Sequence, residues 1–142
     1  GSVTGVTGGF SDIDNLTGGT GTDAFSLNGG TLSGAITGGG GAGVNTLTAD
    51  NGANTWDVTG ADAGSVTGVT GGFSDIASLT GGTGTDAFTL NGGTLSGAIA
   101  GGGGAGVNTL TGDNGANTWA VTGADAGSVT GVTGGFSDID NL

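Results

Sequence analysis

The sequence of residues 1–63 returns almost unchanged in residues 64–126 and begins a third time in residues 127–142. The first two copies differ at only six positions. Such a chain is expected to form a stack of similar units, each of which touches only its neighbours, and not a globule with one unique centre. We therefore expect one continuous array, with boundaries after residues 63 and 126, that is an excerpt from a longer one.

Each repeat divides into two similar halves, since residues 13–29 align with residues 44–60 at an offset of 31 and the next half returns at an offset of 32. Short β-branched and aromatic runs alternate with Gly, Asn and Asp, which predicts strands and turns, and no segment has a helical period. The predicted strands are 14–17, 24–28, 32–37, 45–48, 55–59 and 64–70. Three short strands per half predict an all-β parallel β-solenoid, similar to a β-helix or β-roll, with about 31 residues per coil and two coils per repeat.

Equivalent residues of successive coils are expected to lie one above the other at the ordinary spacing of strands. One predicted column is aromatic and lies in the core: Phe25, Trp56, Phe88 and Trp119. A second predicted column is polar and alternates carboxylate with amide: Asp23, Asn54, Asp86 and Asn117. The alternation keeps like charges two coils apart, which a stack of acidic repeats needs if it is to tolerate its own charge.

The composition excludes several classes of function. The chain has no Lys, Arg or His, and its twelve acidic residues, all Asp, give a formal net charge of −12. Without basic side chains it is not expected to bind nucleic acid or an anionic membrane surface, and no apolar run is long enough for membrane insertion. Cys, Glu and Tyr are also absent, so we expect no enzyme activity and no small-molecule substrate.

A glycine-rich nonapeptide recurs along the chain. Residues 18–26 and 81–89 fit the pattern G-G-x-G-x-D-x-U-x, where U is a large apolar residue, and residues 40–48 and 103–111 fit it with Asn in place of Asp. The chain thus resembles the repeats-in-toxin (hemolysin-type calcium-binding) family, as found in giant repetitive bacterial surface adhesins and fibre proteins. The resemblance implies a parallel β-roll exported from the cell, with Ca²⁺ bound by the motif's Asp side chains and turn carbonyls.

Two interpretations of the Asp residues remain open. In the first, Ca²⁺ binds at stacked turns through five carboxylates: Asp14, Asp23, Asp50, Asp86 and Asp113. In the second, Asp and Asn only make side-chain-to-backbone bonds in turns and ladders. The sixth motif position carries a carboxylate in only some copies, whereas Ca²⁺ prefers six to eight oxygen ligands with enough negative charge.

These observations favour a structural protein. We expect a segment of an extracellular bacterial fibre or adhesin stalk, in surface attachment or biofilm matrix, that associates with itself or stacks with neighbouring repeats. One alternative is an ice-binding module, because Thr-rich turns and the Val3–Thr7 run could present regular Thr columns. Another alternative is a passive spacer in a secreted repeats-in-toxin protein.

Overall fold

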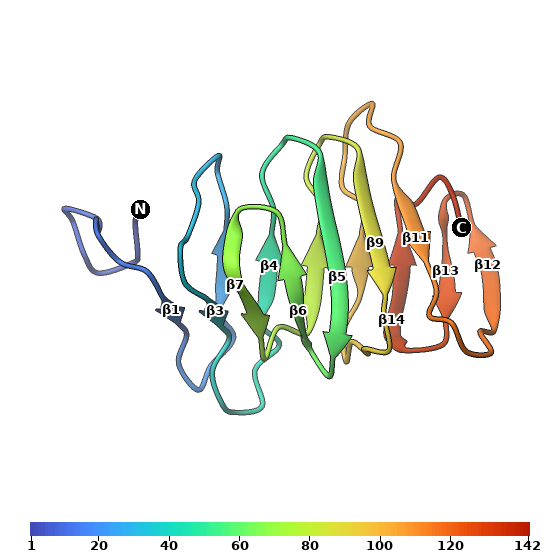
Figure 1. Cartoon of the computed structure of the whole chain (residues 1–142), viewed down its shortest axis with the longest axis horizontal. Helices are drawn as coiled ribbons and strands as arrows, with labels where there is room; N and C mark the ends of the chain where they lie inside the picture. The colour runs from blue at the N-terminus through green and yellow to red at the C-terminus, as the bar shows by residue number, and fades with distance from the viewer.

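The computed structural model describes all residues, 1–142, and contains fourteen β-strands and no helix. The strands are β1 (Leu16–Thr17), β2 (Ala24–Ser26), β3 (Ile36–Thr37), β4 (Thr46–Thr48), β5 (Asn54–Gly60), β6 (Ala63–Val66), β7 (Val69–Ser74), β8 (Ser78–Thr80), β9 (Asp86–Leu90), β10 (Ile99–Ala100), β11 (Thr109–Thr111), β12 (Trp119–Gly123), β13 (Ala126–Val129) and β14 (Val132–Ser137). They lie across the long axis, and the chain ends lie towards opposite ends of that axis (Figure 1). The predicted all-β class is confirmed.

The strands form two sheets of seven strands each. Sheet I has the order β1-β3-β7-β6-β5-β9-β11, and sheet II has the order β12-β13-β14-β10-β8-β4-β2. Both sheets are mixed: β5, β6 and β7 pair antiparallel in sheet I, as do β12, β13 and β14 in sheet II, whereas the other neighbours are parallel. The predicted parallel β-solenoid, with three strands per coil, is therefore wrong.

The antiparallel part arises because the chain folds back twice between residues 54 and 74, across the boundary of the first and second repeats. Asp62, with a φ of 51°, lies in the turn between β5 and β6, and Gly68, with a φ of 89°, lies in the turn between β6 and β7. Asp and Gly enter this left-handed region more readily than most residues. The predicted strand 64–70 therefore spans a turn, and the segment forms a three-stranded antiparallel meander, β5–β7.

The sequence separation between paired strands also departs from the predicted half-repeat. Phe25 pairs with Leu47, and Leu47 pairs with Leu79, so the second step in this row is longer than the first. This uneven spacing breaks the predicted aromatic column, because Phe25 no longer neighbours the first tryptophan. Within that column only Trp56 and Phe88 are paired as predicted.

Equivalent strands of the two repeats lie in opposite sheets. Each 63-residue stretch, 14–76 and then 77–139, enters a sheet five times. The first does so in β1, β2, β3, β4 and the meander β5–β7, and successive entries alternate between sheets I and II. Because five is odd, the second repeat begins in the other sheet: β2 lies in sheet II, and its equivalent β9 lies in sheet I. Two repeats together therefore supply seven strands to each sheet.

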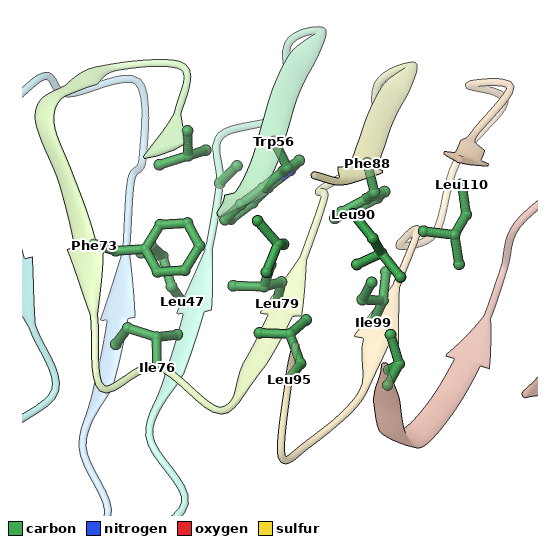
Figure 2. Packing of buried hydrophobic residues seen from close by; sticks show 14 of the residues in the cluster. Leu47, Trp56, Phe73, Ile76, Leu79, Phe88, Leu90, Leu95, Ile99 and Leu110 are labelled. Carbon is green, nitrogen blue, oxygen red and sulfur yellow. The ribbon is translucent and has the colours of Figure 1, made fainter. Parts of the chain in front are cut away.

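Side chains from both sheets fill one core between them (Figure 2). The rings of Trp56 and Phe88 are stacked, with centroids 5.6 Å apart and planes 12° apart, and Phe73 meets Trp56 edge-on at 6.0 Å. Leu47 and Leu79 face these rings from sheet II and are almost fully buried. Each such side chain contributes on the order of 2 kcal/mol through removal of its apolar surface from water.

Candidate functional site

Residues at the sixth position of the nonapeptide lie at, or one residue before, the start of neighbouring strands or bridges, and their side chains accept one another's backbone N–H groups. In sheet I the N–H of Asn54 donates to Oδ1 of Asp86 over 3.0 Å, and the N–H of Asp86 donates to Oδ1 of Asn108 over 3.0 Å. The N–H of Asn108 donates to Oδ2 of Asp140 over 2.7 Å. We call these four residues the Asx ladder. Of the predicted polar column, only the step between Asn54 and Asp86 is correct.

A shorter ladder forms in sheet II. The N–H of Asp23 donates to Oδ1 of Asn45 over 2.9 Å, but the next position is Ala77, which has no side-chain acceptor. The N–H of Ala77 donates to the carbonyl of Asn45 over 3.0 Å, as the N–H of Asp140 does to the carbonyl of Asn108, but Ala77 offers no side-chain acceptor to the N–H of Asn45. One of the six differences between the repeats, Asp14 against Ala77, therefore ends a ladder.

The buried polar side chains of the protein all belong to these two ladders: Asn45, Asn54, Asp86 and Asn108. The amide nitrogens of these Asn residues donate to carbonyls in turns. Nδ2 of Asn45 donates to the carbonyl of Asp75 over 3.0 Å. Nδ2 of Asn108 donates in the same way to the carbonyl of Asp138 over 3.0 Å. Asn45 and Asn108 are thus bonded at both Oδ1 and Nδ2, as buried polar groups generally are.

Asp86 is the exception. It is fully buried, its Oδ1 accepts from both the N–H and Nδ2 of Asn54, and its Oδ2 has no hydrogen-bond partner. Burial raises the pKa of the Asp86 carboxyl above its ordinary value; the bonds from Asn54 oppose this shift, and the neighbouring Asp50 carboxylate adds to it. A carboxylate is therefore held where its charge is poorly compensated.

Four of the five Asp residues predicted to bind Ca²⁺ are not buried, and each accepts a hydrogen bond from nearby backbone or from a side chain. Asp14 accepts a bond from Oγ of Ser33. Asp23 accepts the N–H of Gly19 over 2.8 Å, and Asp113 accepts the N–H of Gly115 over 2.6 Å. These contacts match the second interpretation of the sequence, in which Asp side chains brace the turns.

Asp50, whose Oδ1 accepts the N–H of Gly52 over 2.7 Å, lies near the fifth predicted ligand, Asp86. The Asp50 carbonyl accepts a bond from Nδ2 of Asn54 over 3.1 Å, and Asn54 in turn contacts Asp86. No group of three or more acidic side chains is placed to hold a metal ion. The atoms that best fit a cation are Oδ2 of Asp86, which lacks a partner, and the Asp50 carboxylate, with turn carbonyls supplying further oxygens.

One contact between the repeats was missed by the sequence analysis. The Asp62 carboxylate accepts the N–H of Ser96 through Oδ1 over 2.7 Å and the Ser96 Oγ through Oδ2 over 2.8 Å. Asp62 therefore ties the turn of the meander in the first repeat to a loop of the second. The signal was a Gly-Ala-Asp-Ala-Gly run between two apolar segments, which is typical of a turn.

The structure contains no helix, and therefore none that is long and apolar enough to cross a membrane. No protein-family model matches the chain, and no curated protein or solved structure matches it either. The function is therefore inferred from the geometry of the chain itself.

Proposed function

We propose that the chain is a structural segment of an extracellular bacterial fibre or adhesin stalk, without catalytic activity, whose function is to provide length. One observation carries this proposal: the second repeat makes the local structure of the first again, in the opposite sheet. An added repeat then extends both sheets along the long axis and leaves the cross-section unchanged, as in other arrays whose units contact only their neighbours.

The surface chemistry supports the same role. With twelve Asp residues and no basic residue, neighbouring stacks repel each other sideways at low salt. Sideways repulsion protects a long β-structure from aggregation through its faces. The proposed partners are further repeats or further copies of the chain, not nucleic acid, membranes or small molecules.

The dimension of the array gives the test. Two repeats supply seven strands to each sheet, so at a strand spacing of about 4.8 Å one repeat adds about 17 Å of length. Small-angle X-ray scattering on single chains of two, four and six repeats should give a maximum dimension that grows by this increment at constant cross-section. Growth of the cross-section with repeat number would contradict the proposal.

We further propose that Ca²⁺ stabilises the array at the Asp50 and Asp86 carboxylates. The support is the buried, unpartnered Oδ2 of Asp86 beside a second carboxylate. Millimolar Ca²⁺ should raise the melting temperature relative to a chelator, and the rise should be smaller in Asp86→Asn than in Asp23→Asn. Identical melts in Ca²⁺ and chelator would remove Ca²⁺ from the proposal.

Ice binding stays a second candidate because of one feature of sheet II. Ser26, Thr48 and Thr80 lie in register on the neighbouring strands β2, β4 and β8. The row then passes through Ala100 and Ser137, which interrupts the hydroxyl-and-methyl pattern. Thermal hysteresis and ice shaping at micromolar protein would favour this candidate, and their absence would discard it.

A further inference from the structure

The two ends of the molecule expose apolar side chains whose equivalents in the middle are buried. Seven large apolar side chains are exposed: Val3, Val6, Ile13, Val44, Val107, Val121 and Leu142. Five of them have buried equivalents one repeat away, each at most 5% exposed: Val66, Val69, Ile76, Val58 and Leu79. The other two, Val44 and Val107, are equivalents of each other and are exposed in both repeats. The ends therefore lack a covering that the middle possesses.

In the middle of the molecule, β9 lies beside β5 as its parallel neighbour and covers Val58, the buried equivalent of Val121. Asn54 to Val58 run beside Asp86 to Leu90 in register, which sets Trp56 opposite Phe88. The two rings stack, and both side chains are fully inaccessible to solvent. This pair joins the first repeat to the second.

The two strands that would repeat this pair lie at opposite ends of sheet II. The equivalent of β5 is β12, the edge strand at one end, and the equivalent of β9 is β2, the edge strand at the other end. We propose that the chain binds a second copy of itself end to end, with β12 of one copy parallel to β2 of the next. The register follows from the middle, with Trp119 opposite Phe25 and Val121 opposite Leu27 of the second copy.

A hollow at the β2 end has the right position for the incoming tryptophan. It has a volume of about 1230 Å³ and is lined by Phe25 and Leu27 on one side and by Gly1–Thr4 and Phe10 on another. Phe10 is the equivalent of Phe73, whose ring meets Trp56 edge-on. Trp119 already meets Phe136, a further equivalent of Phe73, edge-on at 6.0 Å. In the proposed contact it enters the hollow beside Phe25, the equivalent of Phe88, and the segment that carries Phe10 gives way to residues 127–142 of the other copy.

The polar groups at the two edges are also complementary. In the middle, Asn54 donates from its N–H and from Nδ2 to Oδ1 of Asp86, over 3.0 and 2.8 Å. The equivalent Asn117 makes only the bonds from Nδ2 to turn carbonyls of its own copy, over 2.9 and 3.2 Å. In the proposed register it faces Asp23 of the next copy. The Asn117 amide therefore donates to the Asp23 carboxylate, and this pair sets no carboxylate opposite another.

The register makes two identical segments compete for one place. Residues 127–142 of one copy have the same sequence as residues 1–16 of the next and would occupy the same position. The C-terminal copy of the segment is the better held, since Val129, Val132 and Ile139 are at most 5% exposed, whereas Val3 and Val6 are about half exposed. We expect residues 1–16 of the copy that offers β2 to be displaced.

Val121→Asp tests the contact in the full chain. Val121 is 66% exposed, so the fold should tolerate the change. Val44→Asp adds the same charge at a side chain that is 53% exposed just before β4, a strand already paired on both sides within its own copy. In sedimentation velocity, the unsubstituted chain and Val44→Asp should associate more strongly as protein and NaCl increase, because salt screens the net charge of −12. Val121→Asp should weaken association at least about tenfold, since a carboxylate would be buried unpaired.

Hydrogen exchange locates the contact. On association, amides near residues 23–27 and 117–121 should become protected, and those of residues 1–16 should exchange faster. A chain that stays monomeric at every salt concentration, equal association of both variants, or protection elsewhere would each overturn the proposal. It rests on the proposed structural function, but the two can fail separately, because single chains of four or six repeats lengthen whether or not their ends bind.

Discussion

Strands β5 and β12 have nearly the same sequence and very different surroundings. Residues 54–60 read Asn-Thr-Trp-Asp-Val-Thr-Gly, and residues 117–123 differ only by Ala120 in place of Asp57. Trp56 and Val58 are completely buried, whereas Trp119 is partly exposed and Val121 is 66% exposed. The reason is position, since β5 lies between β6 and β9 and β12 lies at the edge of its sheet. Burial in this protein is thus a property of the neighbouring strand.

The largest expected effect tests this contrast directly. Trp56→Ala should lower the free energy of unfolding by about 3–5 kcal/mol, because it leaves a cavity between Phe88 and Phe73. Trp119→Ala should cost less than about half of that, because the ring already contacts solvent on one side. Urea unfolding followed by circular dichroism, at protein and salt concentrations that keep the chain monomeric, gives both values. Equal losses would contradict the role of the neighbouring strand.

A smaller effect is expected at the two equivalent carboxylates. In chelator, Asp86→Asn should raise the free energy of unfolding by about 1–3 kcal/mol, because it removes a buried charge whose Oδ2 has no partner. Asp23→Asn at the end of the stack should change it by less than about 0.5 kcal/mol, since that carboxyl is partly exposed and bonded to Gly19. The same urea titrations measure both variants. A destabilised Asp86→Asn would show that the charge is needed where it lies.

The smallest expected effect is a dependence on pH. The pKa of Asp86 is raised by burial, so between the ordinary Asp pKa of about 3.9 and the raised value the native state binds the proton more tightly than the unfolded chain. Stability therefore rises as the pH falls through the raised pKa, and this gain is complete below the ordinary pKa. Melting temperatures between pH 7 and pH 4 should rise less in Asp86→Asn than in Asp23→Asn. Parallel slopes for the two variants would refute this origin of the pH dependence.

Much of the local structure was predictable from the sequence. Strands β2, β4 and β8 lie where short apolar runs are bounded by Gly, Asn and Asp, and the rings of Trp56 and Phe88 were predicted to pair. The role of Asn and Asp in bracing turns follows from their short polar side chains. The proposed Ca²⁺ ligands could be found only as a pattern, because the sequence does not reveal that Asp86 is buried while Asp14 is exposed.

The sequence by itself determined the all-β class, the positions of most short strands and the identity of successive units, since these depend on local propensity and on the repeat. Only the tertiary structure decided which strands are neighbours, including the meander β5–β7 and the exchange of sheets between repeats. Parallel pairing joins residues that are distant in the sequence, such as Ile36 and Phe73, and in a Gly-rich repeat many registers place similar residues opposite one another. The choice among them is made by how Trp56, Phe73 and Phe88 pack into one core.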